Sequence, residues 1–569
     1  MEKNWVEPRE INREATDQLA ADLKITRLLA ALLMGRGIDS YDKAHRFFRP
    51  TLAMLHDPFL MQDMGKAIQR IEQAIENKEK ILIYGDYDVD GTTAVSLVYS
   101  FFLKVHPEIQ YYIPNRYKEG YGVSMIGVDY AIENNYALII CLDCGIKAND
   151  TITYAKKNGV DFIVCDHHLP GDELPPAVAI LDPKRADCSY PYNELSGCGI
   201  GFKLIQAYAQ KNSIAFEELL SFLDLAAISI ASDIVPITGE NRVLAYFGLK
   251  QVNADPRPGI KAIIDSAKTK HELSIENLVF IIGPRINAAG RIKTGMDAVE
   301  LLISTDKAKA EEACTLINQH NNERRDLDKA ITQEALDIIK NDETLINRKT
   351  TVLFKPDWHK GVIGIVASRL IENYYRPTIV LTSSNGMASG SARSVTDFSV
   401  YNAINACEDL LEQFGGHKYA AGLTLKVENI PAFQEKFEKV VGEQIENQLL
   451  VPHINIDAEI KFSEITPKFF RILKQFAPFG PNNMMPVFKT KGVMDNGWAS
   501  TVGDDGKHLR FKVYQQENSN INFGAIGFNL GNKLEIISSG KPFNICYTIE
   551  ENHWNDQITL QLNVKDIQA

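Results

Sequence analysis

Four apolar stretches of the sequence each end in aspartate, and the third ends in an aspartate followed by two histidines. They are KILIYGDYDVDG (80–91), ALIICLDCGI (137–146), DFIVCDHH (161–168) and LAAISIASDIVP (225–236). An ionised carboxylate behind an apolar segment is costly to bury unless a positive charge compensates it. Carboxylate oxygens with one or two imidazoles suit Mg²⁺ or Mn²⁺ better than metals that prefer sulfur. The four motifs therefore predict a divalent-metal site that performs phosphoryl chemistry.

The first motif carries three carboxylates at alternate positions, Asp86, Asp88 and Asp90. An extended segment would place all three on one side, where their mutual repulsion favours a bound cation. An EF-hand calcium loop is one alternative, but this sequence lacks the glutamate that such a loop requires at its twelfth position. An acidic surface turn is the other alternative.

The third motif follows a strand-like run directly, which fits one imidazole as a metal ligand and the other facing a substrate. Asp166 would then orient a ligating imidazole from behind. The nearby Cys141 and Cys144 form a CxxC, so a zinc or redox site is an alternative. No second CxxC follows at finger spacing. We therefore predict that these cysteines are reduced and pack in the core.

Composition sets the frame for these motifs. A chain of 569 residues suggests about three or four domains, and 45% hydrophobic with 24% charged residues is ordinary for a globular protein. The sequence shows no signal peptide and no apolar run of about 20 residues, so we expect a cytoplasmic protein without membrane contact. The net charge of −12 argues against a general polyanion binder but leaves open a local basic groove.

The elements that must position the motifs follow from the hydrophobic pattern. From Ile81 to about Pro236, short Ile/Leu/Val runs alternate with helical patterns, which predicts a parallel sheet flanked by helices. Ligands bind outside the carboxyl ends of the strands in such sheets. The first three acidic motifs fall at those ends, whereas Asp233 follows a segment typical of a buried helix.

The rest of the chain divides by pattern. Long charged helical segments precede a second α/β stretch that opens with TTVLFKP, and the last part alternates strand-like runs with turn signals, as in a small β-barrel. We predict an α/β fold with two lobes, parallel sheets, long joining helices and a C-terminal barrel. The expected regions are 1–75 (helical), 76–296 (first lobe), 297–345 (connecting helices), 346–452 (second lobe) and 453–569 (barrel).

The motifs carry a family resemblance. ILIYGDYDVDG, CLDCGI, VCDHH and ASDIVP resemble the four motifs of the DHH phosphoesterase superfamily. HKGVIGIVASRL (359–370), ASGSARS (388–394) and FGGHKYAAG (414–422) resemble its DHHA1 substrate domain. IPNRYKEGYG (113–122), SGCGIGFKL (196–204), GPRINAAGRI (283–292) and FAPFGPNNMMPVF (476–488) are similar to the RecJ family of bacterial single-strand-specific DNA exonucleases. By the same resemblance the tail would be an OB-type barrel.

The resemblance implies a two-metal phosphodiesterase with Mn²⁺ or Mg²⁺ as cofactor. Asp86 and His168 lie in the catalytic motifs, and His168 is a candidate to contact the scissile phosphate or to assist proton transfer. Two cations would lower the pKa of an attacking water and stabilise the departing oxygen. The implied metal ligands are Asp88, Asp90, Asp143, His167 and Asp233.

Substrate contacts are expected in both lobes. Four arginines beside Gly, Asn or Ser in loop-like sequence can fork onto phosphate, with an ordinary surface ion pair as the alternative for each. The stretch from Ser389 to Ser391 offers hydroxyl and backbone donors and resembles the family segment that holds a terminal 5′ phosphate. The predicted contacts are Arg116, Arg285, Asn287, Arg291, Ser389, Gly390, Ser391, Arg393, Gly415, Gly416 and His417.

The predicted barrel carries aromatic side chains in or beside its strands. Some could stack on unpaired bases, although such aromatics more often fill a barrel core, so none is assigned to binding. A modest basic cluster of Lys507, Arg510 and Lys512 could follow a nucleic-acid backbone. The aromatics are Phe511, Tyr514, Phe523, Phe528 and Trp554.

The resemblance implies a processive exonuclease that removes mononucleotides from single-stranded DNA in the 5′-to-3′ direction during DNA repair and recombination. A single-strand-binding protein and a helicase are the implied partners, and we expect a monomer. A narrow channel between two lobes would exclude a duplex. Two alternatives remain: a DHH phosphodiesterase acting on short oligoribonucleotides, cyclic dinucleotides or pyrophosphate, and a catalytically inactive nucleic-acid binding protein.

Overall fold

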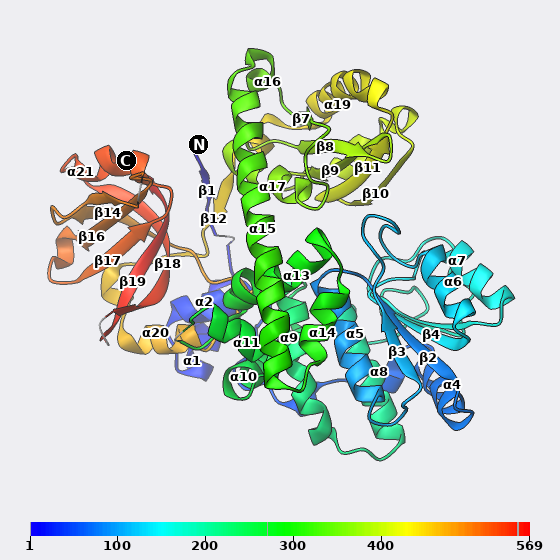
Figure 1. Cartoon of the computed structure of the whole chain (residues 1–569). Helices are drawn as coiled ribbons and strands as arrows, with labels where there is room; N and C mark the ends of the chain where they lie inside the picture. The colour runs from blue at the N-terminus through cyan, green and yellow to red at the C-terminus, as the bar shows by residue number, and fades with distance from the viewer. Residues whose placement is uncertain (1, 9, 270, 504, 555–556) are drawn as a thin grey trace. The chain divides into compact units, whose positions relative to one another are not determined.

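The computed structural model of the chain describes residues 2–8, 10–269, 271–503, 505–554 and 557–569 (Figure 1). It contains two compact units. One comprises residues 52–451 and holds both predicted lobes, and the other combines residues 1–51 with residues 452–569. Among the described residues, no helix combines the length and the apolar character needed to span a membrane.

The first lobe is built on a five-stranded sheet whose paired strands all run parallel, as predicted. Its strands are buried on both faces, which explains their continuous Ile, Leu and Val runs. Side chains of α4, α5 and α8 pack on one face, and those of α6 and α7 pack on the other. The strands in spatial order are β3 (Ile109–Tyr112), β2 (Lys80–Gly85), β4 (Tyr136–Leu142), β5 (Asp161–Cys165) and β6 (Ala179–Leu181). The helices are α4 (Met64–Glu76), α5 (Val89–Phe102), α6 (Met125–Glu133), α7 (Asn149–Lys157) and α8 (Gly197–Lys211).

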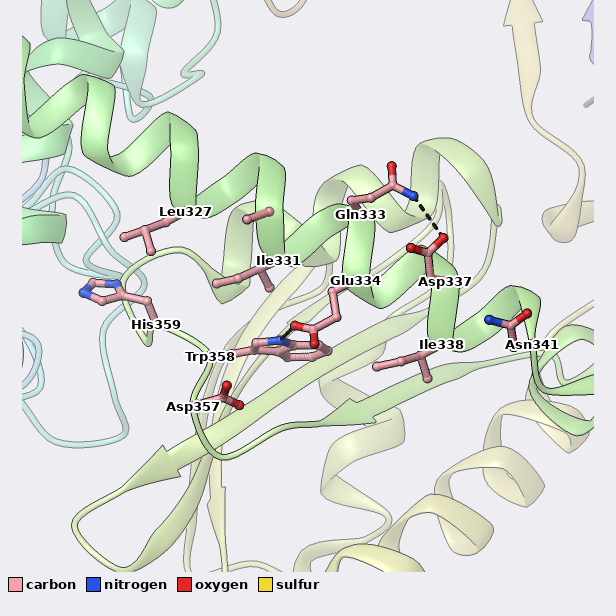
Figure 2. A pocket seen from close by; sticks show the side chains of 11 residues that line it. Leu327, Ile331, Gln333, Glu334, Asp337, Ile338, Asn341, Asp357, Trp358 and His359 are labelled. Atoms are coloured by element: carbon pink, nitrogen blue, oxygen red, sulfur yellow. Dashed lines mark hydrogen bonds between the residues drawn. The ribbon is translucent and has the colours of Figure 1, made fainter.

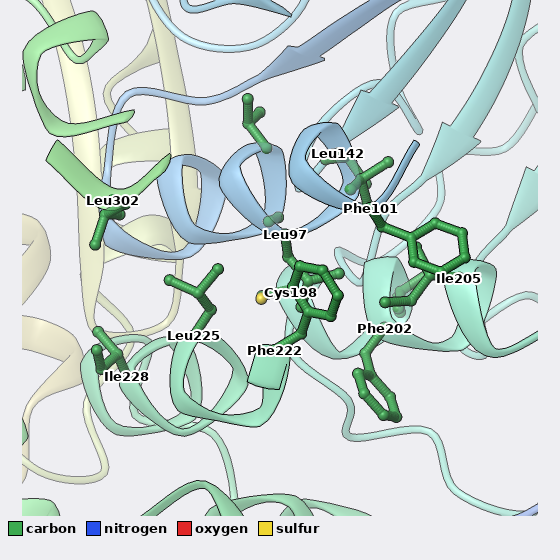
Figure 3. Packing of buried hydrophobic residues seen from close by; sticks show 14 of the residues in the cluster. Leu97, Phe101, Leu142, Cys198, Phe202, Ile205, Phe222, Leu225, Ile228 and Leu302 are labelled. Carbon is green, nitrogen blue, oxygen red and sulfur yellow. The ribbon is translucent and has the colours of Figure 1, made fainter. Parts of the chain in front are cut away.

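A helical layer extends this lobe. Leu97 and Phe101 of α5 pack with Phe202 of α8 and Leu225 of α9 in one apolar cluster (Figure 3). The helix α9 ends at Ser232, so the fourth acidic motif follows a buried helix, as predicted. The added helices are α9 (Leu223–Ser232), α10 (Gly239–Ala254), α11 (Pro258–Ser266), α12 (Ile275–Asn277), α13 (Gly283–Ile292) and α14 (Met296–Ile303).

The long helix α15 (Lys307–Lys340) joins the two lobes (Figure 1). Its 34 residues span about 50 Å at 1.5 Å per residue. Asp328, buried on α15, accepts hydrogen bonds from Arg369 of α17 (Ile363–Asn373) at 2.7 to 3.0 Å, and these bonds fix the second lobe to the helix. A short helix, α16 (Glu343–Asn347), follows.

The second lobe has a mixed sheet in which only β7 and β8 pair in parallel. The chain reverses between β8 and β9 at Asn385 and Gly386, which both adopt positive φ, and this tight turn makes the two strands antiparallel. The strands in order are β10 (Gln413–His417), β11 (Ala420–Leu425), β9 (Met387–Arg393), β8 (Thr378–Ser384) and β7 (Thr351–Phe354). Besides α17, the lobe contains α18 (Val400–Asn405) and α19 (Ile430–Gln444).

The other unit contains the predicted β-rich tail. Its sheet closes through an additional pairing of β14 with β16. The N-terminal helices α1 (Arg13–Leu23), α2 (Arg27–Met34) and α3 (Tyr41–Phe48) share an apolar core with the barrel and with α20 (Pro467–Lys474), and β1 (Asn4–Val6) pairs with β12 (His453–Asn455). The strands in order are β13 (Ala458–Glu459), β14 (Phe488–Asp495), β18 (Phe543–Trp554), β19 (Gln557–Gln568), β17 (Asn522–Gly527), β16 (His508–Gln515) and β15 (Ser500–Val502).

The packing of α10 on α9 predicts the effect of a single methyl group. A Cβ at Gly248 would lie 2.2 Å from the Leu223 carbonyl oxygen and 2.6 Å from the Ala227 Cβ. We expect Gly248→Ala to lower the free energy of unfolding of this lobe by about 1–3 kcal/mol, because the two helices must separate. The thermal unfolding midpoint measures this.

Gly65→Ala is the matched control for this prediction. Gly65 lies in α4 of the same lobe, and a Cβ there meets nothing within 4 Å. The control should be neutral or stabilising by about 0.5–1 kcal/mol, because alanine loses less backbone entropy in a helix. Equal midpoints for the Gly248→Ala protein and the wild type would contradict the close packing.

Candidate metal centre

The strand register of the first lobe brings the acidic motifs together. Gly85, Leu142, Cys165 and Leu181 are paired in one row across β2, β4, β5 and β6. The residue that follows each of them is an aspartate, so the carboxyl edge of the sheet carries a row of acidic side chains. These aspartates are Asp86, Asp143, Asp166 and Asp182, all with less than 3% of their surface exposed.

His167 lies among three carboxylates. Its Nε2 is 3.1 Å from Asp143 Oδ1, 3.5 Å from Asp233 Oδ2 and 3.8 Å from Asp90 Oδ2. His167 belongs to two groups of potential metal ligands. Within each group, the ligand atoms lie within 4.8 Å of one another. One group is Asp90, His167 and Asp233, and the other is Asp143, His167 and His168.

The electrostatics of these groups fit a divalent cation. Burial and the charges of the neighbouring carboxylates raise the pKa values of Asp86, Asp143 and Asp233 well above the usual range. Burial lowers the pKa of His167 to about 4, which keeps the imidazole neutral, the form that binds metal. Asp86 Oδ1, Asp143 Oδ1 and His167 Nδ1 are buried and lack a hydrogen-bond partner within the described ranges. A buried cation would satisfy such oxygens.

Asp90 is held by the amino end of α8. Its carboxylate accepts hydrogen bonds from the backbone N–H of Gly197 at 2.6 Å, the backbone N–H of Cys198 at 2.8 Å and the Ser229 hydroxyl at 2.6 Å. A Cβ at Gly197 would lie 2.6 Å from the Asp143 Cβ, so glycine permits the helix end to approach both carboxylates. The sequence did not predict that these groups donate to Asp90, although the motif SGCGIGFKL, which contains the two backbone donors, was recognised.

Asp88 lies at the start of the next helix. Its Oδ1 accepts the Gly91 N–H at 3.0 Å and so caps α5. Burial and the charge of Asp90 raise the pKa of this carboxyl group. Asp88 belongs to neither of the two groups of close ligand atoms among the described residues, so the structure places this predicted ligand beside them and not within them.

His168 is oriented by Asp166. Asp166 Oδ1 accepts from His168 Nδ1 at 2.7 Å, and the same carboxylate accepts the backbone N–H groups of Ile146, His167 and His168. Burial opposes its ionisation, but the bond and charge of His168 together with the Ile146 N–H outweigh burial and lower the pKa of Asp166 to about 2. Burial lowers the pKa of His168, but the bond to Asp166 and the charges of the surrounding carboxylates together outweigh burial and raise this pKa.

Two further residues contact the His168 ring. The Tyr121 hydroxyl lies 3.1 Å from Nε2, and the His417 ring of the second lobe stacks on it with centroids 6.0 Å apart. The structure thus brings the predicted residue His417 to the metal centre. Tyr121 was missed as a contact, although its segment 113–122 was recognised.

Three of the four predicted arginines gather between the lobes. Burial first, and then the charges of Arg116 and Arg393, lower the pKa of Arg291 to about 9. Burial and the charge of Arg116 lower the pKa of Arg393. Within the described part of the chain, none of the three forms an ion pair with a carboxylate. Such concentrated positive charge is a candidate anion site.

The fourth arginine lies apart from this cluster. Arg285 donates to Asn318 on α15 at 3.0 Å and to the Ile281 carbonyl at 2.7 Å, so it secures α13 to α15. Asn287 lies further along α13, and its Oδ1 is buried without a hydrogen-bond partner among the described residues. Lys360 was missed, and the charge of Arg116 contributes, after burial, to lowering its pKa.

The strand β9 can offer the hydroxyls of Ser389 and Ser391 to a ligand, but its backbone groups are already hydrogen-bonded within the sheet. It pairs with β8 on one side and β11 on the other, so the sheet engages the backbone N–H groups of 389–391 that the sequence suggested as ligand donors. A Cβ at Gly390 would lie 2.4 Å from the Leu381 side chain, so this glycine serves core packing. Ser391 Oγ accepts from Arg393 at 3.1 Å, and Ser389 shares the half-exposed face of the strand. Gly415 and Gly416 lie on the edge strand β10.

A cavity of about 820 Å³ lies elsewhere, between α15 and the loop after β7 (Figure 2). Trp358 forms part of its wall and donates to Glu334 at 2.7 Å. Three carboxylates, those of Glu334, Asp337 and Asp357, line it, and none of the predicted site residues does. Negative charge disfavours phosphate there, so this cavity is not the candidate site.

The aromatic side chains of the barrel differ in their exposure to solvent. Phe511 is buried in the core, whereas Phe528 is 56% exposed beside His508. Arg510 and Lys512 alternate with buried residues of β16 and lie on its exposed face. The side chain of Trp554 lies outside the described residues.

Comparisons with known proteins agree with this geometry. The model of the DHH family, N-terminal domain, matches residues 80–230. The DHHA1 domain matches residues 347–443, and the RecJ OB domain matches residues 456–566. All three domains expected from the motifs are therefore confirmed.

Full-length relatives give the same result. The single-stranded-DNA-specific exonuclease RecJ of Bacillus subtilis is 36% identical over 98% of this chain and 70% of its own length. The enzyme of that name from Haemophilus influenzae is 31% identical over 95% of this chain and 96% of its own length. The crystal structure of RecJ in complex with Mn²⁺ from Thermus thermophilus superposes with a TM-score of 0.85 at 26% identity, covering 100% of this chain and 79% of that chain. The chain therefore belongs to the RecJ family of DHH proteins.

Proposed function

We propose that this chain is a metal-dependent exonuclease that degrades single-stranded DNA from its 5′ end and releases mononucleotides. The observation that carries the proposal is the proximity of two clusters of opposite charge. The Arg116 charge acts on the carboxyls of Asp86 and Asp88, and Asp88 in turn acts on Arg291. A phosphodiester strand satisfies both clusters, because it can bring a terminal phosphate to the arginines while another phosphate lies among the metal ligands.

The cofactor follows from the donor set. Asp88, Asp90, Asp143, His167 and Asp233 would hold Mn²⁺ or Mg²⁺, and the RecJ of Thermus thermophilus was crystallised with Mn²⁺. When bound, the ions supply an activated water and stabilise the departing oxygen. The raised carboxyl pKa values and the unsatisfied oxygens support this assignment.

The chain's own residues supply the proton chemistry. Asp166 fixes the His168 ring through Nδ1. The other ring nitrogen, Nε2, contacts the Tyr121 hydroxyl and is the atom that can exchange this partner for a substrate. His168 can therefore hold a proton at Nε2 beside a phosphate oxygen or the leaving oxygen. Asp86 is buried at the end of β2, where burial and the charge of Asp88 raise the pKa of its carboxyl group.

The arginine cluster sets the proposed polarity. Arg116, Arg291 and Arg393, with the hydroxyls of Ser389 and Ser391, would bind a terminal 5′ phosphate. The metal centre would then cut the next phosphodiester, which releases one nucleotide per step. The absence of ion-pair partners for these arginines within the described ranges supports an anionic ligand.

Single-strand selectivity follows from contacts between the lobes. Arg291 donates to the Gly361 carbonyl at 3.0 Å, and His168 stacks on His417. Both contacts join the two lobes near the two charge clusters, and we infer that the strand between the lobes must be single. Because one chain supplies both lobes, we infer that a monomer suffices. A single-strand-binding protein and a helicase that supply such strands fit this substrate.

An end-labelled degradation assay tests the proposal. With Mn²⁺, the protein should release mononucleotides from the 5′ end of 5′-phosphorylated single-stranded DNA and leave the matching duplex largely intact. Attack on a dinucleotide alone would favour the alternative phosphodiesterase. Release from the 3′ end, or equal attack on the duplex, would contradict the polarity or the strand selectivity.

Replacing one ligand should separate stability from metal binding. Asp143→Asn removes a buried, repelled charge, and asparagine tolerates the left-handed backbone at φ 60°. At pH 8 without metal, we expect the variant to unfold at a higher temperature than the wild type, because folding at that pH must either bury the repelled carboxylate or protonate it, and asparagine avoids both costs. Added Mn²⁺ should raise the wild-type midpoint and leave that of the variant nearly unchanged.

Asp265→Asn is the control for this experiment. Asp265 forms an exposed ion pair with Lys261 on α11, so its loss should change neither the midpoint nor the response to Mn²⁺. A wild-type Mn²⁺ response in the Asp143→Asn protein would exclude Asp143 as a ligand.

The arginine cluster predicts a dependence on the 5′ phosphate. Arg393→Gln should lower the ratio of kcat/KM for 5′-phosphorylated over 5′-hydroxyl strands by about tenfold to a hundredfold, the scale of a lost hydrogen bond to a charged group. Lys426→Gln, which removes an exposed cation of the same lobe, should leave the ratio unchanged. An unchanged ratio in the Arg393→Gln protein would place the phosphate elsewhere.

A further inference from the structure

The residue directly after Asp233 has an unusual backbone conformation. Ile234 has a φ of +59°, in the left-handed region that β-branched residues rarely adopt. Among the described residues, twelve non-glycine residues have positive φ, and the other eleven are Lys, Asp, Asn or Ser. Ile234 is thus the one apolar and β-branched member of the described set.

The surroundings of Ile234 provide little apolar packing to offset this backbone strain. Its side chain is 69% exposed, so the isoleucine contributes little apolar burial to the fold. Other helices of the chain solve the same turn with residues suited to it: the equivalent position after α4 is Lys78, and after α7 it is Gly159. A strained and exposed isoleucine is therefore costly to the free chain, and such strain concentrates at functional sites.

The position of Ile234 connects it to the metal centre. Asp233, its neighbour, ends α9 and has a carboxylate oxygen 3.5 Å from His167 Nε2. Val235 on the other side is buried, so the turn is anchored and presents the isoleucine outward. An apolar side chain thus faces solvent one residue from the proposed ligand set.

We propose that Ile234 is a positioning residue that packs against the nucleobase of a nucleotide adjoining the scissile phosphate. The inference rests on the proposed function and adds a substrate contact to it. A base offers an apolar face whatever its identity, so the contact would hold the strand without reading its sequence. The exposed isoleucine would gain its burial only when the strand is bound.

Ile234→Gly tests this inference, because it should separate stability from substrate binding. Glycine adopts the turn without strain, so the thermal midpoint should stay equal or rise. On 5′-phosphorylated single-stranded DNA with Mn²⁺, KM should rise about tenfold, the scale of burying part of an aliphatic side chain, with kcat within twofold. Ile234→Val and Ile234→Leu should keep a KM close to that of the wild type. The Mn²⁺ concentration for half-maximal activity should not change.

Lys78→Gly is the matched control. Lys78 occupies the same position after α4 with φ +56°, but it precedes β2 and lies at the opposite end of the sheet from the metal centre. This variant should share the change in thermal midpoint and keep the wild-type KM.

A modified strand separates a base contact from other roles. On an oligonucleotide whose first three 5′ nucleotides lack bases, the wild type and the Ile234→Gly protein should have KM values within twofold of each other. A persistent tenfold gap, an unchanged KM on normal DNA, or a shifted Mn²⁺ requirement would each overturn the inference. A wild type that fails to degrade single-stranded DNA in the same assay would instead overturn the proposed function.

Discussion

The repulsion among buried carboxylates around His167 is the constraint on which the rest of the structure depends. Asp90, Asp143 and Asp233 each have an oxygen within 3.8 Å of the same imidazole nitrogen. Burial and mutual charge raise the pKa values of Asp143 and Asp233, so the ionised cluster destabilises the chain without a cation. Strand pairing and hydrogen bonds hold this arrangement in place. The row of paired strand ends positions Asp143 and the DHH histidines, and Asp90 accepts two hydrogen bonds from the amino end of α8 and one from Ser229 of α9.

Positive charge from both lobes lies opposite this negative cluster. Arg291 of the first lobe and Arg393 of the second lie close to Arg116, and burial and the repulsion among these arginines lower the pKa values of Arg291 and Arg393. Among the described residues neither cluster is neutralised by ion pairs of its own, and on the proposed function a phosphodiester with its metal ions would neutralise both. The helix α15 and the bond between Asp328 and Arg369 hold the two lobes in one body, so the spacing of the two clusters is a property of the fold.

Much of this architecture could be predicted from the sequence. Continuous Ile/Leu/Val runs ending in aspartate specify parallel strands with a shared acidic edge, because only burial on both faces makes such runs favourable. The helix before Asp233 was predictable from its apolar segment, and the three domains were recognisable from their motifs. The detailed contacts of the site could not be predicted. The donors to Asp90 come from the backbone of Gly197 and Cys198, and backbone donors leave no side-chain signal. Gly390 looked like part of a phosphate loop, yet it makes room for Leu381. Tyr121 and the strained Ile234 become visible only when backbone angles and exposure are known.

On the proposed function, divalent cations and a terminal 5′ phosphate occupy the two clusters at the same time. Anomalous diffraction from a crystal of the Asp166→Asn protein, grown with Mn²⁺ and a 5′-phosphorylated oligonucleotide, tests this simultaneous occupancy most directly, because the change should weaken turnover without removing a proposed ligand. We predict manganese peaks among the side chains of Asp88, Asp90, Asp143, His167 and Asp233, with the 5′ phosphate between Arg116 and Arg393. Manganese peaks elsewhere, or a 3′ end in the arginine cluster, would contradict it.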